Sequence, residues 1–445
     1  MKYRSISCYV VATLLAQPLH AQTPWTLRQC ADYAIDHNIS IKQKDNQRKQ
    51  RDLQLSTARN SRLPDLSASA SESFSFGRGL TLDNTYTNRS TNSTSFSLGT
   101  TVPLFTGFRI PNQIKLNQLN LEAATKDLQK AKDDISMQVA KAYVQILYDT
   151  EIAEVAHRQI AIDSAQVARL EAFLKNGKAS PAEVSQQQST LAQARLTATQ
   201  ADNNLQLSIL ALTQLLELSS PEGFSIVRPN VDSNVSLFTL HSSLLSPDAI
   251  YQEALALKPE VQAENLRLTA SERSIKIAKS ALYPTLNFSA GLQSNYYKTD
   301  GIKADPFATQ MKNNFSQYIG LSLNVPIFAR FQTRNNIRSA RLDYDNQQLQ
   351  LENVKKTLYK EIQQVYYNAV AADSKYHSSE AAAQSSQDAF TLVQAKYENG
   401  KATITEFNEA KNNYLKAESN LVQARYELLY QHALLNFYRG KELNF

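Results

Sequence analysis

The stretch LKNGKASPAEV at Leu174–Val184 decides the fold, because it returns as YENGKATITEF at Tyr397–Phe407. Two further motifs return in the same order, about 220 positions along the chain. These pairs are LPDLSAS (Leu63–Ser69) with YPTLNFS (Tyr283–Ser289), and VPLFTGF (Val102–Phe108) with VPIFARF (Val325–Phe331). The chain is therefore a tandem duplication of one unit of roughly 200 residues, far longer than the repeats of about 20–50 residues that build solenoids.

The first 21 residues predict an export signal. Lys2 and Arg4 form a positive segment, Ile6–Ala16 is a short apolar run, and small residues precede a cleavage point after Ala21. The run is too short to span a bilayer. A buried N-terminal strand is the alternative. We predict a signal peptide at 1–21, a first structural repeat at 22–218, an inter-repeat linker at 219–246 and a second repeat at 247–445.

The composition limits the possible functions. The formal net charge is +6, and losing Lys2 and Arg4 with the signal lowers it to about +4. Basic residues are interspersed with acidic ones, so nucleic acid is not the expected partner. Without Cys8, which leaves with the signal, Cys30 stands alone and predicts no intrachain disulfide. No apolar run approaches twenty residues, so no transmembrane helix is predicted.

Two segments predict very long helices. Ile110–Leu174 and Ser339–Tyr397 contain no helix breaker apart from Pro111 at the very start of the first segment, and the first would extend about 100 Å. Each ends at Asn-Gly, a helix stop signal. Ser180 and Thr403 then suit the N-cap of a returning helix, so each repeat is predicted to contain a helical hairpin. The two returning helices carry coiled-coil-like stripes at Val184, Gln187, Leu191, Ala194, Ala198, Ala201 and Leu205, and at Phe407, Ala410, Tyr414, Ala417, Leu421, Ala424 and Leu428.

Four shorter segments predict strands. Apolar and small polar residues alternate from Leu66 to Phe76, Phe96 to Leu104, Leu286 to Leu292 and Ile319 to Val325, and polar loops are expected at 79–92 and 298–314. Each strand is long enough to cross a bilayer when tilted. Four strands cannot close a barrel, and an open edge is not tolerated in lipid. If these strands lie in a membrane, the chain must therefore oligomerise: two copies give eight strands and three give twelve. A soluble sandwich sheet is the alternative. Membrane-interface aromatics are predicted at Phe105, Phe108, Phe328 and Phe331.

From about Trp25 to Tyr438, the chain resembles the TolC family of outer-membrane efflux proteins. The resemblance rests on one order of elements that occurs twice: helix, β-hairpin, VP[LI]F motif, long helix, NGKA[ST] turn and heptad helix. The resemblance implies a mainly α fold with β: a homotrimer with a periplasmic α-barrel and a 12-stranded transmembrane β-barrel, located in the outer membrane of a Gram-negative bacterium. The linker at 219–246 resembles the family's equatorial collar. The implied partners are a periplasmic adaptor (membrane fusion protein), an inner-membrane transporter and outer-membrane lipid.

The same resemblance implies site residues. Glu406 and Glu409 match the acidic ring of the periplasmic aperture, and they share a helix face because they lie three positions apart. Glu183 and Tyr397 match a contact that closes the tips. Ala402 departs from the family, which often carries a basic second latch at that position. The turns implied for adaptor docking are Asn176, Gly177, Lys178, Asn399, Gly400 and Lys401.

No motif predicts catalysis. The six histidines have no metal-ligand spacing, and no nucleophile elbow or phosphate-binding loop stands in a strand–turn–helix context. We therefore predict a protein that is not an enzyme and needs no cofactor. The predicted function is a passive trimeric exit duct for small molecules or secreted cargo. The alternative is a structural coiled-coil envelope protein or adhesin without channel activity.

Overall fold

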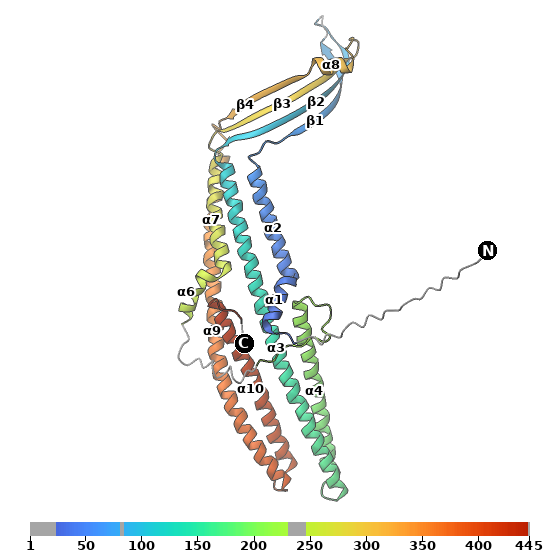
Figure 1. Cartoon of the computed structure of the whole chain (residues 1–445), viewed down its shortest axis with the longest axis vertical. Coiled ribbons are helices and arrows are strands. Elements are labelled where there is room, and N and C mark those ends of the chain that lie inside the picture. Colours follow the sequence, from blue (N-terminus) through green and yellow to red (C-terminus); the bar gives the residue numbers. More distant parts are fainter. Residues whose placement is uncertain (1–23, 81–83, 230–245, 444–445) are drawn as a thin grey trace, which may run out of the picture.

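The computed structural model describes residues 24–80, 84–229 and 246–443. They form an elongated molecule with a β-sheet at one end and the tips of two helical hairpins at the other (Figure 1). The predicted signal peptide at 1–21 and the middle of the predicted linker lie outside the described residues.

Each repeat supplies the same series of elements, to which the second adds the short helix α8. The first contains α1 (Leu27–His37), α2 (Ile39–Asn60), β1 (Ser67–Leu80), β2 (Tyr86–Thr106), α3 (Arg109–Lys175) and α4 (Pro181–Leu215). The second contains α6 (Pro247–Leu257), α7 (Pro259–Ser280), β3 (Thr285–Thr299), α8 (Phe307–Asn313), β4 (Ser316–Asn324), α9 (Gln332–Glu398) and α10 (Ile404–Tyr438). The prediction of a mainly helical chain with four strands is confirmed.

The long helices α3 and α9 are equal in length, at 67 residues each. The predicted start of α9 at Ser339 is wrong, because the helix begins at Gln332. Its first turns are polar and carry no apolar periodicity, so local pattern does not indicate a helix there. The residue before each long helix, Phe108 or Phe331, is left-handed, with φ of 65° and 61°. Both copies of the VP[LI]F motif thus turn the chain from strand into helix in the same way.

The turns between the long and returning helices form as predicted. Gly177 and Gly400 have φ of 70° and 71°, the left-handed geometry that ends many helices. The Lys178 amide bonds to the Phe173 carbonyl at 2.8 Å, and in the second repeat the same bond joins Lys401 to Lys396 at 2.8 Å. These bonds satisfy carbonyls that the helix end would otherwise leave unpaired.

Both returning helices begin with a reciprocal capping box. Ser180 Oγ accepts from the Glu183 amide at 3.2 Å, and Glu183 Oε2 accepts from the Ser180 amide at 2.7 Å. Thr403 and Glu406 repeat the arrangement with the same two distances. The predicted N-caps are therefore confirmed, and each cap satisfies two amides at the helix start.

The four strands form one antiparallel sheet in the order β1-β2-β3-β4, so the two repeats pair through β2 and β3. The strands are longer than predicted. The loop expected at 79–92 shrinks because β1 runs to Leu80 and β2 begins at Tyr86, and the loop expected at 298–314 contains α8. Small hydroxyl residues take part in the pairing of β1 with β2: Ser71 and Ser95 lie opposite each other, and their Oγ atoms are 2.7 Å apart.

Buried apolar residues gather where the helices pack side by side. One cluster surrounds Cys30 and Val139 where α1 meets α3, and another joins Ile250 and Ile362 where α6 meets α9. The predicted small-residue stripe of α4 is buried against α3 through Ala198 and Ala201, which allows close helix approach. Within the described ranges, no helix has the length and apolar character needed to cross a membrane.

Candidate functional site

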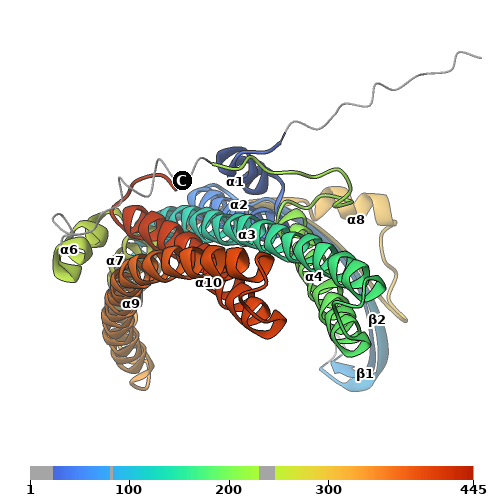
Figure 2. The same ribbon diagram turned by 90° about the horizontal axis from the view of Figure 1, so that it is seen from below.

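The candidate site is the end of the molecule farthest from the sheet, where the α3/α4 and α9/α10 hairpins turn (Figure 1). Viewed along the long axis, α4, α3, α10 and α9 form a curved wall (Figure 2). The two hairpins meet where α3 packs against α10. The six residues predicted for adaptor docking are all exposed at the two turns: Asn176, Gly177, Lys178, Asn399, Gly400 and Lys401.

Glu406 and Glu409 lie together, as their spacing predicts. Both are exposed and line one groove of about 480 Å³ between α9 and α10, with Lys396 and Lys401 on its wall. Hydrogen bonds from the backbone and side chain of Thr403 lower the pKa of Glu406, and Lys396 lowers it further. Glu406 therefore stays ionised near neutral pH and also caps α10.

Glu183 and Tyr397 approach each other from different hairpins. The Tyr397 ring packs on Phe407 at 5.0 Å between centroids and lies 5.1 Å from the Arg169 guanidinium. Burial raises the pKa of Tyr397, Arg169 opposes the shift, and the Glu183 carboxylate adds to it. No hydrogen bond joins Glu183 to Tyr397 in the described part of this single chain, and the Glu183 carboxylate instead caps α4.

Arg169 is a tip residue that the sequence did not reveal. Its Nη2 donates to the Glu398 carbonyl at 3.2 Å, so it bridges from α3 to the end of α9. Ala402 lines the groove beside Glu406 and offers no basic group. The cation next to Tyr397 thus comes from the opposite hairpin, and no motif around Arg169 marks that role in advance.

A buried polar cluster lies farther from the tip on the same seam. Asp163 on α3 and Lys411 on α10 form an ion pair in which both side chains are 0% exposed. Gln187 Nε2 donates to Asp163 Oδ1 at 3.2 Å, and Asn408 Nδ2 donates to Gln187 Oε1 at 3.0 Å. The sequence held one signal for this cluster: Lys411 lies on the buried face of α10 between Phe407 and Leu415, where a lysine needs a partner.

The predicted interface aromatics lie where the sheet meets the long helices. Phe105 and Phe108 form an edge-to-face pair with centroids 5.3 Å apart, and Phe328 and Phe331 form the equivalent pair at 5.6 Å. Phe108, Phe328 and Phe331 expose more than half of their surface. The structure therefore brings the four residues together as two matching pairs.

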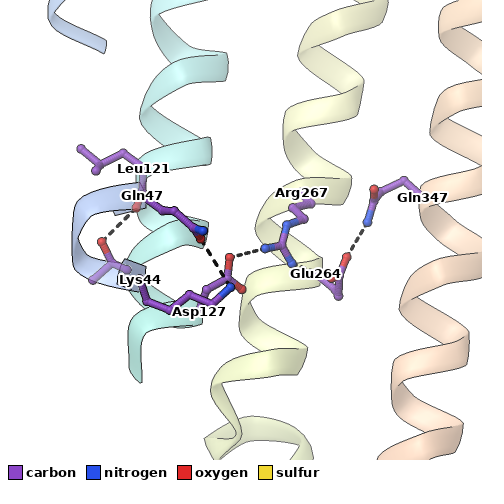
Figure 3. A network of polar contacts seen from close by, with 8 residues as sticks. Lys44, Gln47, Leu121, Asp127, Glu264, Arg267 and Gln347 are labelled. Carbon is purple, nitrogen blue, oxygen red and sulfur yellow. Dashed lines mark hydrogen bonds and ion pairs between the residues drawn. The ribbon is translucent and has the colours of Figure 1, made fainter. Parts of the chain in front are cut away.

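Polar contacts also join the repeats nearer the sheet (Figure 3). Arg267 on α7 forms ion pairs with Asp127 on α3 and with Glu264 on its own helix. Gln347 on α9 donates to Glu264 Oε2 at 2.5 Å. Three helices from both repeats are thus held together by one chain of side chains.

A cavity of about 300 Å³ lies among α3, α7, α9 and α10. On α3 its lining residues fall between Asp127, which contacts Arg267, and the buried Asp163. Lys258 lies over the Phe437 ring at 3.7 Å, and burial lowers its pKa. Asp133 and Glu260 line the same cavity, and burial raises the pKa of each. Among the described residues, no group of three or more His, Cys, Asp or Glu side chains could hold a metal ion.

The model of a family described as "Outer membrane efflux protein" matches residues 31–217 and 250–441, which cover both repeats. The chain belongs to the outer membrane efflux protein family. Its members are transport channels rather than enzymes, so this family member is an outer-membrane efflux channel of a Gram-negative envelope.

Individual relatives are distant in sequence but similar in fold. The outer membrane efflux protein BepC of Brucella suis is 22% identical over 336 residues, covering 75% of this chain and 69% of BepC. The outer membrane protein TolC of Vibrio cholerae is 23% identical over 326 residues, covering 71% and 70%. The crystal structure of the Campylobacter jejuni CmeC outer membrane channel has a TM-score of 0.76 at 18% identity, covering 94% of this chain and 87% of CmeC.

Proposed function

We propose that three copies of this chain form a passive exit duct from the periplasm to the exterior. The observation that carries the proposal is the four-stranded sheet, in which β1 and β4 each pair with one neighbour while apolar side chains such as Phe76 and Ile319 are exposed. An edge of this kind must pair with another chain if the sheet lies in lipid. Joining β4 of one copy to β1 of the next satisfies both edges.

Barrel size favours three copies over two. Two copies would close eight strands, and the interior of an eight-stranded barrel is just wide enough for side chains or one small ligand. Three copies would close twelve strands and leave a lumen. The curved wall of helices supports the same assembly, because three such arcs placed around one axis make a tube below the barrel (Figure 2).

The tips would control passage. Three copies of Glu406 and Glu409 would place two rings of carboxylates around the aperture, and such rings favour cations. Tyr397 and Glu183 would form the closing contact, and the effect of the Glu183 carboxylate on the pKa of Tyr397 supports this pairing. If Tyr397→Phe leaves the conductance of an intact trimer unchanged, this contact is not part of the closed state.

The exposed NGK turns would bind the helical hairpin of a periplasmic adaptor, and an inner-membrane transporter would supply energy and choose the cargo. We infer small molecules or secreted cargo as the transported class. The support is the family membership together with the exposed lysines at both tips, Lys178 and Lys401, which suit a partner with acidic or polar residues.

The deciding experiment has two readouts. The mass of the purified protein in detergent, corrected for bound detergent, should equal three chains of near 50 kDa. In planar bilayers it should show small cation-selective openings. A monomer without openings would contradict the duct and favour the structural alternative.

The acidic ring needs a control that separates charge from capping, because Glu406 does both. Glu406→Gln/Glu409→Gln removes both charges, and glutamine at position 406 can still cap α10. Glu406→Ala/Glu409→Ala removes charge and cap together. Loss of cation selectivity in both variants supports the ring, whereas loss in the alanine variant alone assigns the effect to the cap.

A further inference from the structure

The seam between α3 and α10 carries charged pairs of alternating sign. On α10 the charges recur one heptad apart and alternate from positive to negative to positive. From the tip upward the pairs are Lys411 with Asp163, Glu418 with Arg158, and Arg425 with Glu151. If α10 slid by one heptad in either direction, like charges would face each other, so the pattern opposes sliding of one hairpin along the other.

The pairs differ in burial along the seam. Arg158 is 56% exposed in its pair with Glu418, whereas Asp163 and Lys411 are fully enclosed. Among the described residues, Asp163 Oδ2 and Asn408 Oδ1 are buried without a hydrogen-bond partner, so Asp163 depends on Lys411 and Gln187, which both bond to its Oδ1. Solvent and salt therefore screen the Asp163–Lys411 attraction less than the exposed Arg158–Glu418 pair, and removing one partner would leave the other charge buried and unpaired.

The buried pair is poorly explained as a device for stability alone. Apolar residues of similar volume hold a helix seam as well as a buried ion pair, or better. What a charged pair adds is one defined position of α10 on α3. Lys411 lies little more than one turn from Glu406 and half a turn from Glu409 on α10, and Asp163 shares α3 with Arg169, which contacts Tyr397.

We propose that the Asp163–Lys411 pair is the joint that fixes the second-repeat hairpin against the first, and thereby positions Glu406 and Glu409 at the aperture. This inference rests on the proposed duct, since it assigns the joint a role in aperture size. Asp163 and Lys411 are positioning residues: they act through the rigid helices that carry the tip residues and touch no cargo.

The first test measures tip geometry without using transport. Lys178→Cys and Lys401→Cys place one thiol on each tip; Cys30 is buried, and Cys8 leaves with the predicted signal peptide. The full-length assembly is treated with a short bismaleimide, and the fraction of chains linked internally is measured by mass spectrometry. Lys411→Met in this background should lower that fraction, because Asp163 is left buried without its partner. The matched control is Lys49→Met, which removes a lysine from an exposed pair with Asp45 on α2 and should leave cross-linking unchanged.

The second variant distinguishes an effect of the broken ion pair from an effect of losing the Lys411 side chain by itself. Asp163→Asn/Lys411→Met removes both charges, so cross-linking should recover towards the level of the parent protein. Cross-linking of Lys411→Met at the parent level would overturn the proposal, and so would a double variant no better than the single one. If Lys411→Met does not assemble, Gln187→Met replaces it: this change removes one hydrogen bond to Asp163, and undiminished cross-linking overturns the proposal.

Bilayer recordings of the same variants then connect the joint to the aperture. Lys411→Met should increase conductance relative to Lys49→Met, and the double variant should reduce it again. If the cross-linking changes as expected but no variant conducts, the joint stands and the proposed duct fails. If all variants conduct alike while cross-linking falls, the joint does not set the aperture.

Discussion

Lys258 in the second repeat makes the contact that Asn38 makes in the first. Asn38 Nδ2 donates to the Leu215 carbonyl at 3.1 Å, and Lys258 Nζ donates to the Phe437 carbonyl at 3.2 Å. Each residue stands between two short helices and ties them to the end of its returning helix. The second repeat has exchanged a neutral donor for a charged one, and the exchange comes with a cavity lined by carboxylates.

Replacing Lys258 should cost more than replacing its counterpart. Lys258→Met removes the donor to Phe437 and leaves the carboxylates of Asp133 and Glu260 without their nearest buried cation, a loss of about 1.5–3 kcal/mol. Asn38→Ala removes the N-cap of α2 and the donor to Leu215 but leaves no charge unpaired, and it should cost about 1–2 kcal/mol. Thermal unfolding of the assembled protein gives both values. A smaller effect for Lys258→Met than for Asn38→Ala would contradict a structural role for the buried charge.

The acidic side chains of that cavity predict a pH dependence. Burial raises the pKa of Asp133 and Glu260, so the folded protein holds protons that the unfolded chain has released. Their contribution to stability is complete below their ordinary pKa values, near pH 4, and is lost as pH rises through the raised values of the folded state. Asp133→Asn/Glu260→Gln should reduce the slope of the unfolding midpoint against pH across this window. An unchanged slope in the variant would show that other groups cause the pH dependence.

Gly107 should resist substitution, although its counterpart carries a side chain. Gly107 has φ of 60°, and a Cβ there would lie 2.5 Å from the Ser280 carbonyl oxygen. Gly107→Ala should therefore cost more than the 1–2 kcal/mol of left-handed strain alone. The control is Arg330→Ala at the equivalent exposed position, where φ is 48° and a change within about 0.5 kcal/mol is expected. Equal unfolding midpoints for the two variants would rule out the predicted clash.

Cys30 should be unreactive until the protein unfolds. Its side chain is 0% exposed, and burial raises the pKa of the thiol to about 12. At pH 8 a maleimide should modify no Cys30 in the assembled protein and all of it in denaturant, as mass spectrometry would show. Lys178→Cys at the exposed tip serves as the reactive control. Rapid modification of native Cys30 would mean that the contact between α1 and α3 opens readily.

The lengths of the strands could not be predicted from the sequence pattern alone. The alternation from Leu66 to Phe76 identified the strand, but its continuation to Leu80 depends on pairing with Tyr86 across the sheet. Likewise, α8 within the expected polar loop is held by contacts from outside the helix: Gln310 Nε2 donates to the Tyr297 carbonyl at 3.1 Å. These features depend on partners that local periodicity does not identify.

The sequence by itself determined the duplication, the two hairpins, the four strands and the position of Glu406 and Glu409 on one helix face near one turn. Helix stops, capping boxes and side-chain periods act within a few residues, so they can be read along the chain. Only the tertiary structure decided that Arg169 meets Tyr397, that Asp163 pairs with Lys411 and that Lys258 faces a carboxylate-lined cavity. Apart from Lys258 and its near neighbour Glu260, those contacts join residues more than a hundred positions apart, and they depend on how far each helix is rotated and shifted against its neighbour. Packing of the whole molecule sets that rotation and shift.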